Sequence, residues 1–259
     1  PTPTEVVDEM LRLAEVGAGD VLYDLGCGDG RIVIAAAKRY GVKAVGIDID
    51  PVRIGESNDN AAKAGLAGKV RFVQQDLFEA DFKDATVVTM YLLTSVNLRL
   101  RPKLLADLKA GTRLVSHSFE MGEWRPDKTT VVTTSFGDQH DVHFCIVPAN
   151  VTGRWEWDVG AGAGRKHFML EASQQFQKVT ASGREGDRPL SVNDVRLAGD
   201  ALKFRIDAEA NGKMISDLYE GKVAGDTIVG TVRRAGNAKA AAVAWTAVRD
   251  PKTAVSIAK

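Results

Sequence analysis

Apolar and polar positions follow two alternating patterns over the first 150 residues of the chain. Short apolar runs that end at turn-forming residues predict buried strands, and they cover residues 21–25, 42–47, 70–73, 86–92 and 113–118. Between them, apolar residues spaced three or four apart predict helices over residues 32–38, 53–64 and 96–108. Strands that alternate with helices favour an α/β fold, with a doubly wound, mostly parallel sheet and helices on both of its faces.

The two ends of this region depart from the alternation. Residues 131–135 and 142–147 predict two strands with no helix between them, and the short linker favours an antiparallel hairpin. At the start of the chain, Thr2, Pro3 and Glu5 fit a capping box in which Thr2 is the N-cap of a first helix. We therefore expect the sheet to end in an antiparallel hairpin and a capped helix to cover it.

After Pro148 the pattern changes to short segments in which apolar and polar residues alternate with a period of two. Turn-forming pairs separate these segments, among them Asn211-Gly212, which is a strong hairpin signal. The turns recur about every 8–12 residues, which favours an all-β antiparallel meander, curled or closed into a barrel. We therefore predict two domains, residues 1–150 and residues 151–259.

Composition excludes several classes of protein. The chain carries 34 Lys and Arg residues against 34 Asp and Glu residues, so it lacks the cationic excess of a dedicated nucleic-acid binder or a polybasic membrane anchor. No apolar run approaches the roughly 20 residues of a membrane-spanning helix. Cys27 and Cys145 are too few for a disulfide framework or a cysteine-rich zinc site. We expect no nucleic-acid partner, no membrane span and no metal.

The balance of charge differs between the two predicted domains. Residues 1–150 carry 17 basic and 21 acidic residues, a net charge of −4, whereas residues 151–259 carry 17 and 13, a net charge of +4. The chain begins at Pro1 rather than Met, which indicates that residues upstream were removed. We expect a cytoplasmic protein, on the condition that no export segment was among those residues.

The most informative segment follows the first predicted strand and reads Asp24-Leu-Gly26-Cys27-Gly28-Asp29-Gly30-Arg31. Glycines at alternate positions allow a sharp turn and a close approach of the backbone to a ligand. The helix after them offers free N–H groups and the positive end of its dipole. A dinucleotide-binding loop needs a glycine at the position of Arg31, so a nicotinamide-dependent oxidoreductase is disfavoured.

Two further carboxylates end the second and third predicted strands. Asp48 lies 20 residues after Gly28, at a strand end where an acid can accept both hydroxyls of a ribose. Asp76 ends the third strand, where a carboxylate can accept a hydrogen bond from the exocyclic amine of adenine. Because the carboxyl ends of parallel strands meet at one edge of a sheet, these segments predict a site for an adenosine that carries something other than a pyrophosphate.

With both acids at these strand ends, residues 1–148 resemble the class I S-adenosylmethionine-dependent methyltransferases. The resemblance rests on residues 24–30, 46–48 and 75–77, and it implies a Rossmann-like methyltransferase sheet. Residues 90–126 are most similar to the seven-strand protein-lysine methyltransferases of the type that modifies the c-subunit of mitochondrial ATP synthase. The β-rich half and the lack of a hydrophobic membrane segment depart from that type.

The resemblance implies S-adenosyl-L-methionine as the cofactor and S-adenosyl-L-homocysteine as its product. The residues it assigns to the cofactor are Asp24, Gly26, Cys27, Gly28, Asp48, Ile49, Asp76 and Leu77, with Thr2 and Thr4 over the methionine end. Cys27 stands where the family usually has a serine and Asp48 where it usually has a glutamate, which leaves the acceptor open. Asp50 has two interpretations, a second ribose acceptor or the N-cap of the helix that starts at Pro51, and the cap is favoured.

Methyl transfer from a sulfonium is an in-line displacement in which the enzyme mainly positions the reactants, so it needs no metal and no nicotinamide. An amine acceptor must first lose its proton, and a tyrosine oxygen or a carboxylate can orient the neutral amine. The candidate catalytic residues, near the ends of the fourth and fifth predicted strands, are Tyr91, His117 and Glu120. For His117, a packed histidine with satisfied hydrogen bonds is the commoner case.

We predict N-methylation of a protein lysine or another amine, with a protein or a small molecule as the methyl acceptor. Two alternatives stay open: a small-molecule methyltransferase with the β-rich half as a lid, and a noncatalytic S-adenosylmethionine-binding or scaffold protein. The β-rich half carries no constellation of catalytic residues, so it is expected to shape substrate access, to supply an interface or to stabilise the end of the sheet.

Overall fold

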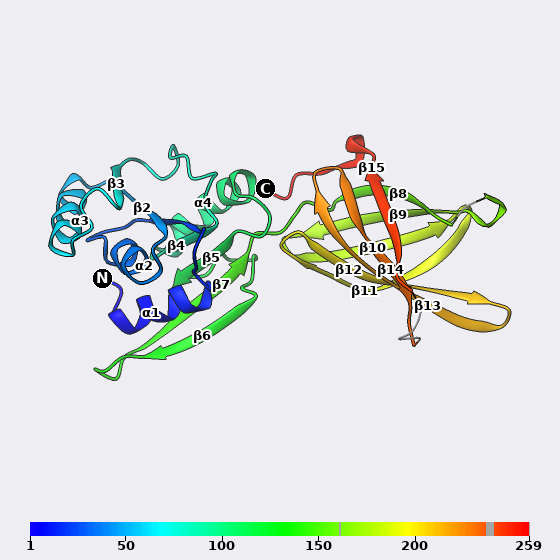
Figure 1. Cartoon of the computed structure of the whole chain (residues 1–259), viewed down its shortest axis with the longest axis horizontal. Helices are drawn as coiled ribbons and strands as arrows, with labels where there is room; N and C mark the ends of the chain where they lie inside the picture. The colour runs from blue at the N-terminus through cyan, green and yellow to red at the C-terminus, as the bar shows by residue number, and fades with distance from the viewer. Residues whose placement is uncertain (161, 237–240, 259) are drawn as a thin grey trace. The chain divides into compact units, whose positions relative to one another are not determined.

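The chain folds into two compact units in the computed structural model, which describes residues 1–160, 162–236 and 241–258 (Figure 1). The first unit comprises Pro1–Val147 and the second Pro148–Ile257. Each unit is built on a sheet of its own, one open and one closed.

A seven-stranded sheet forms the first unit, with its strands in the order β3-β2-β1-β4-β5-β7-β6. The strands are β1 (Val21–Leu25), β2 (Lys43–Asp48), β3 (Arg71–Gln74), β4 (Val87–Met90), β5 (Arg113–His117), β6 (Lys128–Thr133) and β7 (Gln139–Ile146). The neighbours among β1 to β5 pair in parallel, and β7 is antiparallel to both β5 and β6. The predicted doubly wound, mostly parallel sheet with a terminal hairpin is confirmed.

Four helices accompany this sheet: α1 (Thr4–Leu13), α2 (Arg31–Tyr40), α3 (Pro51–Lys63) and α4 (Thr94–Asp107). The apolar stripe of α1, with Val6, Met10 and Leu11 fully buried, packs in one cluster with Leu22 of β1 and Val33 of α2. Burial of apolar surface contributes about 25 cal/mol per Å², so this cluster holds the helix layer to the sheet. Within the described residues, no helix combines the length and the apolar character that a membrane crossing requires.

The predicted capping box at the start of α1 is wrong. The helix begins at Thr4 with Pro3 as its N-cap residue, and no side chain caps it. The hydroxyl of Thr2 instead forms a hydrogen bond with Nδ1 of His117 at 3.1 Å. Glu5 accepts a hydrogen bond from a backbone N–H in the loop between β6 and β7, at 3.0 Å. Partners more than 100 residues away thus replace the local contacts that the sequence favoured.

Eight antiparallel strands form the second unit and close into a barrel in the order β10-β11-β12-β13-β14-β15-β8-β9. They are β8 (Gly153–Val159), β9 (Lys166–Gln175), β10 (Lys178–Glu185), β11 (Arg188–Ala198), β12 (Ala201–Ala210), β13 (Lys213–Ala224), β14 (Thr227–Arg234) and β15 (Val243–Arg249). Short 3₁₀ helices lie at η1 (Gly162–Gly164) and η2 (Pro251–Thr253). The predicted hairpin at Asn211-Gly212 joins β12 to β13, with φ angles of 52° and 71° at the two residues. The all-β prediction is confirmed in its closed form.

Aromatic side chains fill the middle of the barrel. Alternation along each strand points every second residue inward, and the inward residues include Trp155, Trp157, Phe204, Tyr219 and Trp245, each at most 3% exposed. Phe204 and Tyr219 stack with their ring centroids 4.9 Å apart. The interior at this level is therefore a packed layer.

Candidate cofactor and acceptor site

The loop between β1 and α2 turns sharply because its glycines adopt positive φ angles of 80° at Gly26, 53° at Gly28 and 79° at Gly30. The N–H groups of Gly26 and Cys27 both donate to the carbonyl of Ile47 in β2, at 2.8 and 3.0 Å. A Cβ added at Gly28 would meet no atom within 4 Å, so the backbone there borders open space. The loop is therefore fixed to the sheet on one side and free to contact a ligand on the other.

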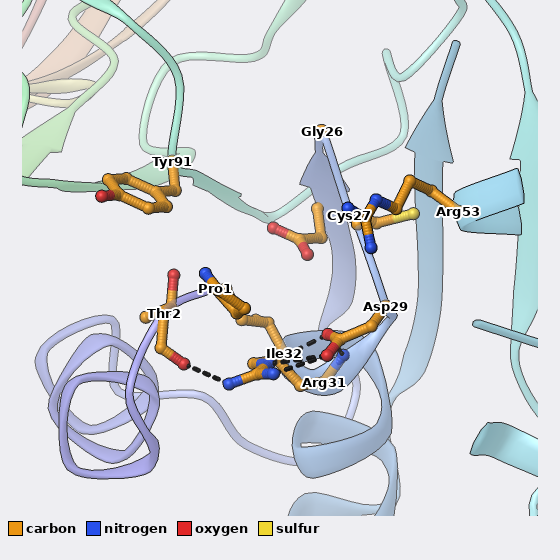
Figure 2. Close-up of a pocket in the computed structure, with 11 residues that line it drawn as sticks. Pro1, Thr2, Gly26, Cys27, Asp29, Arg31, Ile32, Arg53 and Tyr91 are labelled. Carbon is orange, nitrogen blue, oxygen red and sulfur yellow. Dashed lines mark hydrogen bonds and ion pairs between the residues drawn. The ribbon is translucent and has the colours of Figure 1, made fainter. Parts of the chain in front are cut away.

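A cavity of about 220 Å³ lies against this loop (Figure 2). Its walls come from the N-terminal segment, β1 and the loop after it, the starts of α2 and α3, and the residue that follows β4. Six residues singled out in the sequence meet there: Thr2, Asp24, Gly26, Cys27, Gly28 and Tyr91. The structure thus gathers the residues predicted for the methionine end of the cofactor together with one predicted for the acceptor.

Asp24 lines this cavity although its side chain is almost entirely buried. Its Oδ1 accepts a hydrogen bond from the hydroxyl of Thr89 at 2.8 Å. Burial raises the pKa of Asp24 to about 7, and the carboxylates of Asp48 and Asp29 act in the same direction. A cation placed beside such a group favours its charged form. The cavity therefore suits a ligand that carries an ammonium group.

Arg31 ties the N-terminal segment to the glycine loop, a role that the sequence did not predict. Its guanidinium pairs with the carboxylate of Asp29 at 2.5 Å and donates to the carbonyl oxygen of Thr2 at 2.8 Å, as Figure 2 shows. The hydrogen bonds from Arg31 lower the pKa of Asp29, so both groups are charged. The other lining residues that were not predicted are Pro1, Ile32 and Arg53. The one feature of the sequence that drew attention to Arg31 was its position, where a dinucleotide-binding motif would have a glycine.

Asp48 connects the end of β2 to the glycine loop. Its Oδ2 accepts from the N–H of Gly28 at 2.9 Å, and its Oδ1 accepts from the N–H of Asp50 at 3.0 Å. A carboxylate has about four acceptor positions, so Asp48 keeps capacity for a ligand. Asp50 accepts a hydrogen bond from the N–H of Val52 at 2.8 Å, which confirms it as the N-cap of α3.

The other residues predicted for the adenosine lie outside the cavity, at the ends of β2 and β3. Ile49 is 65% exposed. Asp76 is exposed and accepts a hydrogen bond from the N–H of Phe78 at 2.9 Å, and Leu77 is half-buried. The predicted cofactor residues are thus divided between a cavity at Asp24 and an open surface beyond the strand ends.

Tyr91 and His117 form one aromatic unit beside the cavity. The Tyr91 ring is 41% exposed and lies 4.0 Å from the His117 ring and 5.9 Å from the Phe119 ring, between centroids. His117 is fully buried, and its ring nitrogens contact the Thr2 hydroxyl at 3.1 Å and Nδ1 of His140 at 3.0 Å. Burial lowers the pKa of His117 to about 4, so the ring is neutral near pH 7. His117 therefore supports Thr2 and Tyr91 from behind the wall of the cavity.

Two other candidates lie outside the cavity, and a third lines it with a buried thiol. Glu120 pairs with Arg125 at 2.7 Å, and Thr4 is the exposed first residue of α1; neither lines the cavity. Cys27 lines it, but its thiol is buried, and burial raises the pKa of Cys27 to about 12. A Cβ added at Gly46 would lie 2.7 Å from the Cβ of Cys27, so Cys27 packs tightly on β2. No cluster of His, Cys, Asp and Glu suited to a metal occurs within the described ranges.

Comparison with known proteins gives concordant results for this part of the chain. Residues 24–128 match the family model described as the ANTKMT methyltransferase domain. A protein-lysine N-methyltransferase of Saccharolobus islandicus is 48% identical over 148 residues, which cover 57% of this chain and 91% of that relative. The lysine N-methyltransferase of the ATP synthase c-subunit from Mus musculus is 35% identical over 130 residues, covering 50% of this chain and 52% of that relative.

One similar protein has been solved with a ligand bound. The crystal structure of an RNA methyltransferase from Salinibacter ruber in complex with S-adenosyl-L-homocysteine is 52% identical, with a TM-score of 0.55, and the match covers 58% of this chain and 95% of that one. The open sheet, the glycine loop and the acids at its strand ends define a class I methyltransferase that uses S-adenosylmethionine. Within that class, the chain belongs to the same family as the protein-lysine N-methyltransferase of Saccharolobus islandicus, and its residues 24–128 match the ANTKMT methyltransferase domain. The predicted family resemblance and the predicted cofactor are confirmed.

Proposed function

We propose that this chain methylates the ε-amino group of a lysine in a protein. Three relatives support this acceptor by their names: the protein-lysine N-methyltransferase of Saccharolobus islandicus and, from Mus musculus, the lysine N-methyltransferases of the ATP synthase c-subunit and of the adenine nucleotide translocase. The structural observation that carries the proposal is the half-exposed ring of Tyr91 on the cavity that Asp24 also lines. An aromatic face attracts alkylammonium groups, and a lysine side chain is long enough to reach into such a cavity.

The residues present fit the cofactor in three places. The buried carboxylate of Asp24 suits the ammonium of the cofactor's methionine part. The open space at Gly28 leaves room for the amino-acid end of that methionine. Asp48 keeps free acceptor positions for the ribose hydroxyls, and Asp76 keeps its Oδ2 for the adenine amine. The exposed Ile49 offers an apolar face to the adenine ring. When bound, the cofactor supplies an electrophilic methyl group on its sulfonium.

For the acceptor lysine, the chain orients the amino group and provides the surroundings in which that group loses its proton. A lysine must be neutral at the moment of attack, so its proton is given up to solvent or to a nearby oxygen. We assign to the Tyr91 hydroxyl the role of holding a neutral amine by a hydrogen bond, because Tyr91 lines the cavity and its side chain is exposed. His117 acts as a positioning residue, because it is buried and neutral and supports both Tyr91 and Thr2.

The decisive experiment identifies the molecule that receives a radioactive methyl group. The 259-residue chain is incubated with a cell extract and S-adenosylmethionine carrying a radioactive methyl group, and the products are treated separately with protease and with ribonuclease. The expected label is released by protease and recovered as methyllysine after hydrolysis. Asp48→Ala should reduce it, whereas Asp59→Ala, a substitution of an exposed aspartate on α3, should not. Label in protein but on a residue other than lysine would overturn the lysine assignment.

RNA is the second candidate acceptor, because the Salinibacter ruber protein that is 52% identical is described as an RNA methyltransferase. The balanced charge of the chain argues against it. Label released by ribonuclease would decide for RNA, and label in small molecules would decide for the lid interpretation of the barrel. No label in any fraction, with S-adenosylhomocysteine still bound, would favour a noncatalytic role. A cytoplasmic location stays a prediction that cell fractionation would test.

A further inference from the structure

We propose that the barrel contains a second binding site, for a small amphipathic anion with an apolar body and one oxyanion group. This site is separate from the cofactor site and independent of the identity of the methyl acceptor. Four features of the barrel support it: a cavity at one end, a seal at the other, a cationic mouth, and a buried donor without an acceptor.

The cavity has a volume of about 350 Å³, within the range of about 300–1,000 Å³ that small-molecule sites occupy. It lies where β8, β10, β12 and β14 end and where β9, β11, β13 and β15 begin. Its apolar wall consists of inward-facing side chains, chiefly Phe168, Leu190, Ile206, Tyr219 and Val232. Two of these, Phe168 and Tyr219, contact the packed aromatic layer or are part of it, which makes that layer the floor of the cavity.

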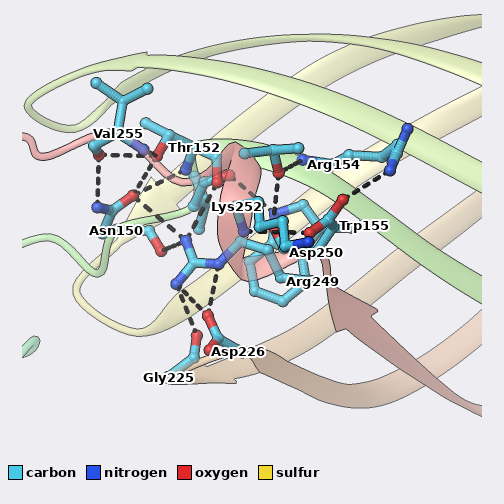
Figure 3. A network of polar contacts seen from close by, with 12 residues as sticks. Asn150, Thr152, Arg154, Trp155, Gly225, Asp226, Arg249, Asp250, Lys252 and Val255 are labelled. Carbon is cyan, nitrogen blue, oxygen red and sulfur yellow. Dashed lines mark hydrogen bonds and ion pairs between the residues drawn. The ribbon is translucent and has the colours of Figure 1, made fainter.

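The opposite end of the barrel is sealed by Arg249, which is 8% exposed (Figure 3). Its guanidinium donates to Oδ1 of Asp226 at 2.8 Å and to the carbonyl oxygens of Asn150 and Thr152 at 2.9 and 3.1 Å. It also lies over the ring of Trp155, 4.8 Å from the centroid. Arg249 therefore closes the end of the barrel opposite the cavity.

The mouth of the cavity is lined by charged side chains, an unusual choice for the inward face of a small barrel. Lys166 pairs with Glu185 at 3.0 Å, and Arg234 pairs with Asp217 at 2.6 Å. The opposite charges within each pair cancel, so the two pairs leave no net charge. Inward charges on a sheet are tolerated only where they are paired or hydrated, so this end of the barrel is built to hold polar atoms above an apolar wall.

Arg188 adds an uncompensated positive charge to this mouth. It lines the cavity, and its guanidinium reaches only the carbonyl oxygen of Glu209, at 3.4 Å. Within residues 1–160, 162–236 and 241–258, no carboxylate pairs with it. Arg233, which also lines the cavity, has a distant partner in Glu220 at 3.9 Å. A guanidinium binds carboxylate, sulfonate or phosphate oxygens in a forked geometry, so Arg188 is the group that would hold the oxyanion.

A buried donor without an acceptor lies in the aromatic layer beneath the cavity. The indole Nε1 of Trp245 is buried and has no acceptor in the described part of the chain. The Trp245 ring lies 5.2 Å from that of Tyr219, which lines the cavity. An unpaired buried donor is unfavourable. Trp245 does not itself line the cavity, so a ligand would reach its Nε1 only by passing beyond the Tyr219 ring.

The test uses two fluorescent probes that share their aromatic rings and differ in one sulfonate: 1-anilinonaphthalene-8-sulfonate and neutral N-phenyl-1-naphthylamine. Both are titrated into the full chain saturated with S-adenosylhomocysteine, so that the cofactor site is occupied. We expect saturable binding of one probe molecule per chain. Loss of binding when S-adenosylhomocysteine is added would place the probe in the cofactor site and overturn the proposal.

Arg188→Gln separates the two probes. It should weaken binding of the sulfonate about tenfold, as expected for one charge-assisted contact, and change binding of the neutral probe less than twofold. The matched control is Arg196→Gln, an exposed arginine on the same strand that does not line the cavity. Equal effects of the two substitutions on the sulfonate would contradict the role of Arg188.

Ala208→Trp tests the cavity itself. Ala208 lines it, so a tryptophan there should fill the space and abolish binding of both probes. Ala244→Trp, at an exposed position of β15 outside the cavity, is the control, and an unchanged far-ultraviolet spectrum of each variant verifies the fold. Probe binding that survives Ala208→Trp would overturn the site.

Discussion

The two units of this chain use different parts of a β-sheet for binding. In the first unit, polar side chains lie at the carboxyl ends of parallel strands and in the loops after them, and the sheet itself is buried. In the second, the inner face of the sheet carries the binding features, and five of the connections between its strands are only two residues long. The difference follows from topology, because a parallel sheet is covered by helices on both faces, whereas a closed barrel encloses space.

Removal of residues 152–259 should have the largest effect on this comparison. If the barrel positions the acceptor, the fragment should bind S-adenosylhomocysteine within about twofold of the full chain while kcat/KM for the protein acceptor falls by ~100-fold or more. Calorimetry and the labelling assay measure the two quantities. Equal turnover by fragment and full chain would leave the barrel only a stabilising role, and an unfolded fragment would show that the units are not independent.

Arg249→Met should disturb the barrel and spare the cofactor site. The substitution leaves the carbonyls of Asn150 and Thr152 without their donor, so we expect the barrel to lose about 3 kcal/mol of unfolding free energy. Denaturant unfolding followed by tryptophan fluorescence measures this loss. The exposed Arg196→Met is the control and should change stability little. A large fall in S-adenosylhomocysteine affinity in Arg249→Met would show that the two units are coupled.

Asp48→Ala acts in the first unit alone. It should weaken binding of S-adenosylhomocysteine by about 1–3 kcal/mol, because the ribose hydroxyls lose a charged acceptor. Asp50→Ala is the matched control, since Asp50 caps α3 through the N–H of Val52. The control should lower helix stability slightly and leave affinity unchanged. If calorimetry gives the reverse pattern, Asp50 rather than Asp48 holds the ribose.

A graded, pH-dependent effect concerns the proton on Asp24. Its pKa of about 7 in the unliganded protein means that, below pH 7, a ligand ammonium must displace a proton. Affinity for S-adenosylhomocysteine should therefore fall by up to about tenfold for each pH unit below 7, and Asp24→Asn should remove this dependence. His117, with a pKa of about 4, titrates outside that range. A flat profile between pH 5.5 and 7 for the native chain would contradict contact between Asp24 and the ammonium.

Stability gives a second measurement of the same group. The folded-state pKa of Asp24 lies above the model-compound value of 3.8, so the protonated form favours folding. Its contribution is complete at low pH and is lost as the pH rises through about 7. Asp24→Asn should therefore raise the thermal midpoint of the unliganded first unit above pH 7.

The sequence predicted the first unit well because its signals are local. Gly26 and Gly28 lie between a strand and a helix within a few residues, and Asp48 follows at a fixed spacing. The structure agrees for the strands and helices, although β4 ends at Met90, two residues before the predicted end. Tyr91 leaves the sheet there to line the cavity, and a period-two pattern does not reveal such a departure.

Contacts between distant segments could not be predicted. Thr2 fits a local capping box, and only the folded sheet brings it to His117, 115 residues away. The link from Arg31 to the N-terminal segment is of the same kind. In the barrel the sequence predicted strands and turns, but the cavity at Arg188 depends on eight strands that each contribute one to three residues, and no short motif records that.

The strand pairing that closes the barrel is short, and this determines where the barrel first opens. Strands β8 and β15 pair at two positions, Glu156 with Val248 and Trp155 with Arg249, whereas β8 and β9 pair at seven. The shortest ladder of a closed sheet is where thermal fluctuations part it first, because fewest hydrogen bonds break. Amide hydrogen exchange along β15 should therefore be faster than in the other strands, because β15 separates from β8 by local opening. The hydrogen bonds of Arg249 should limit how often this opening occurs.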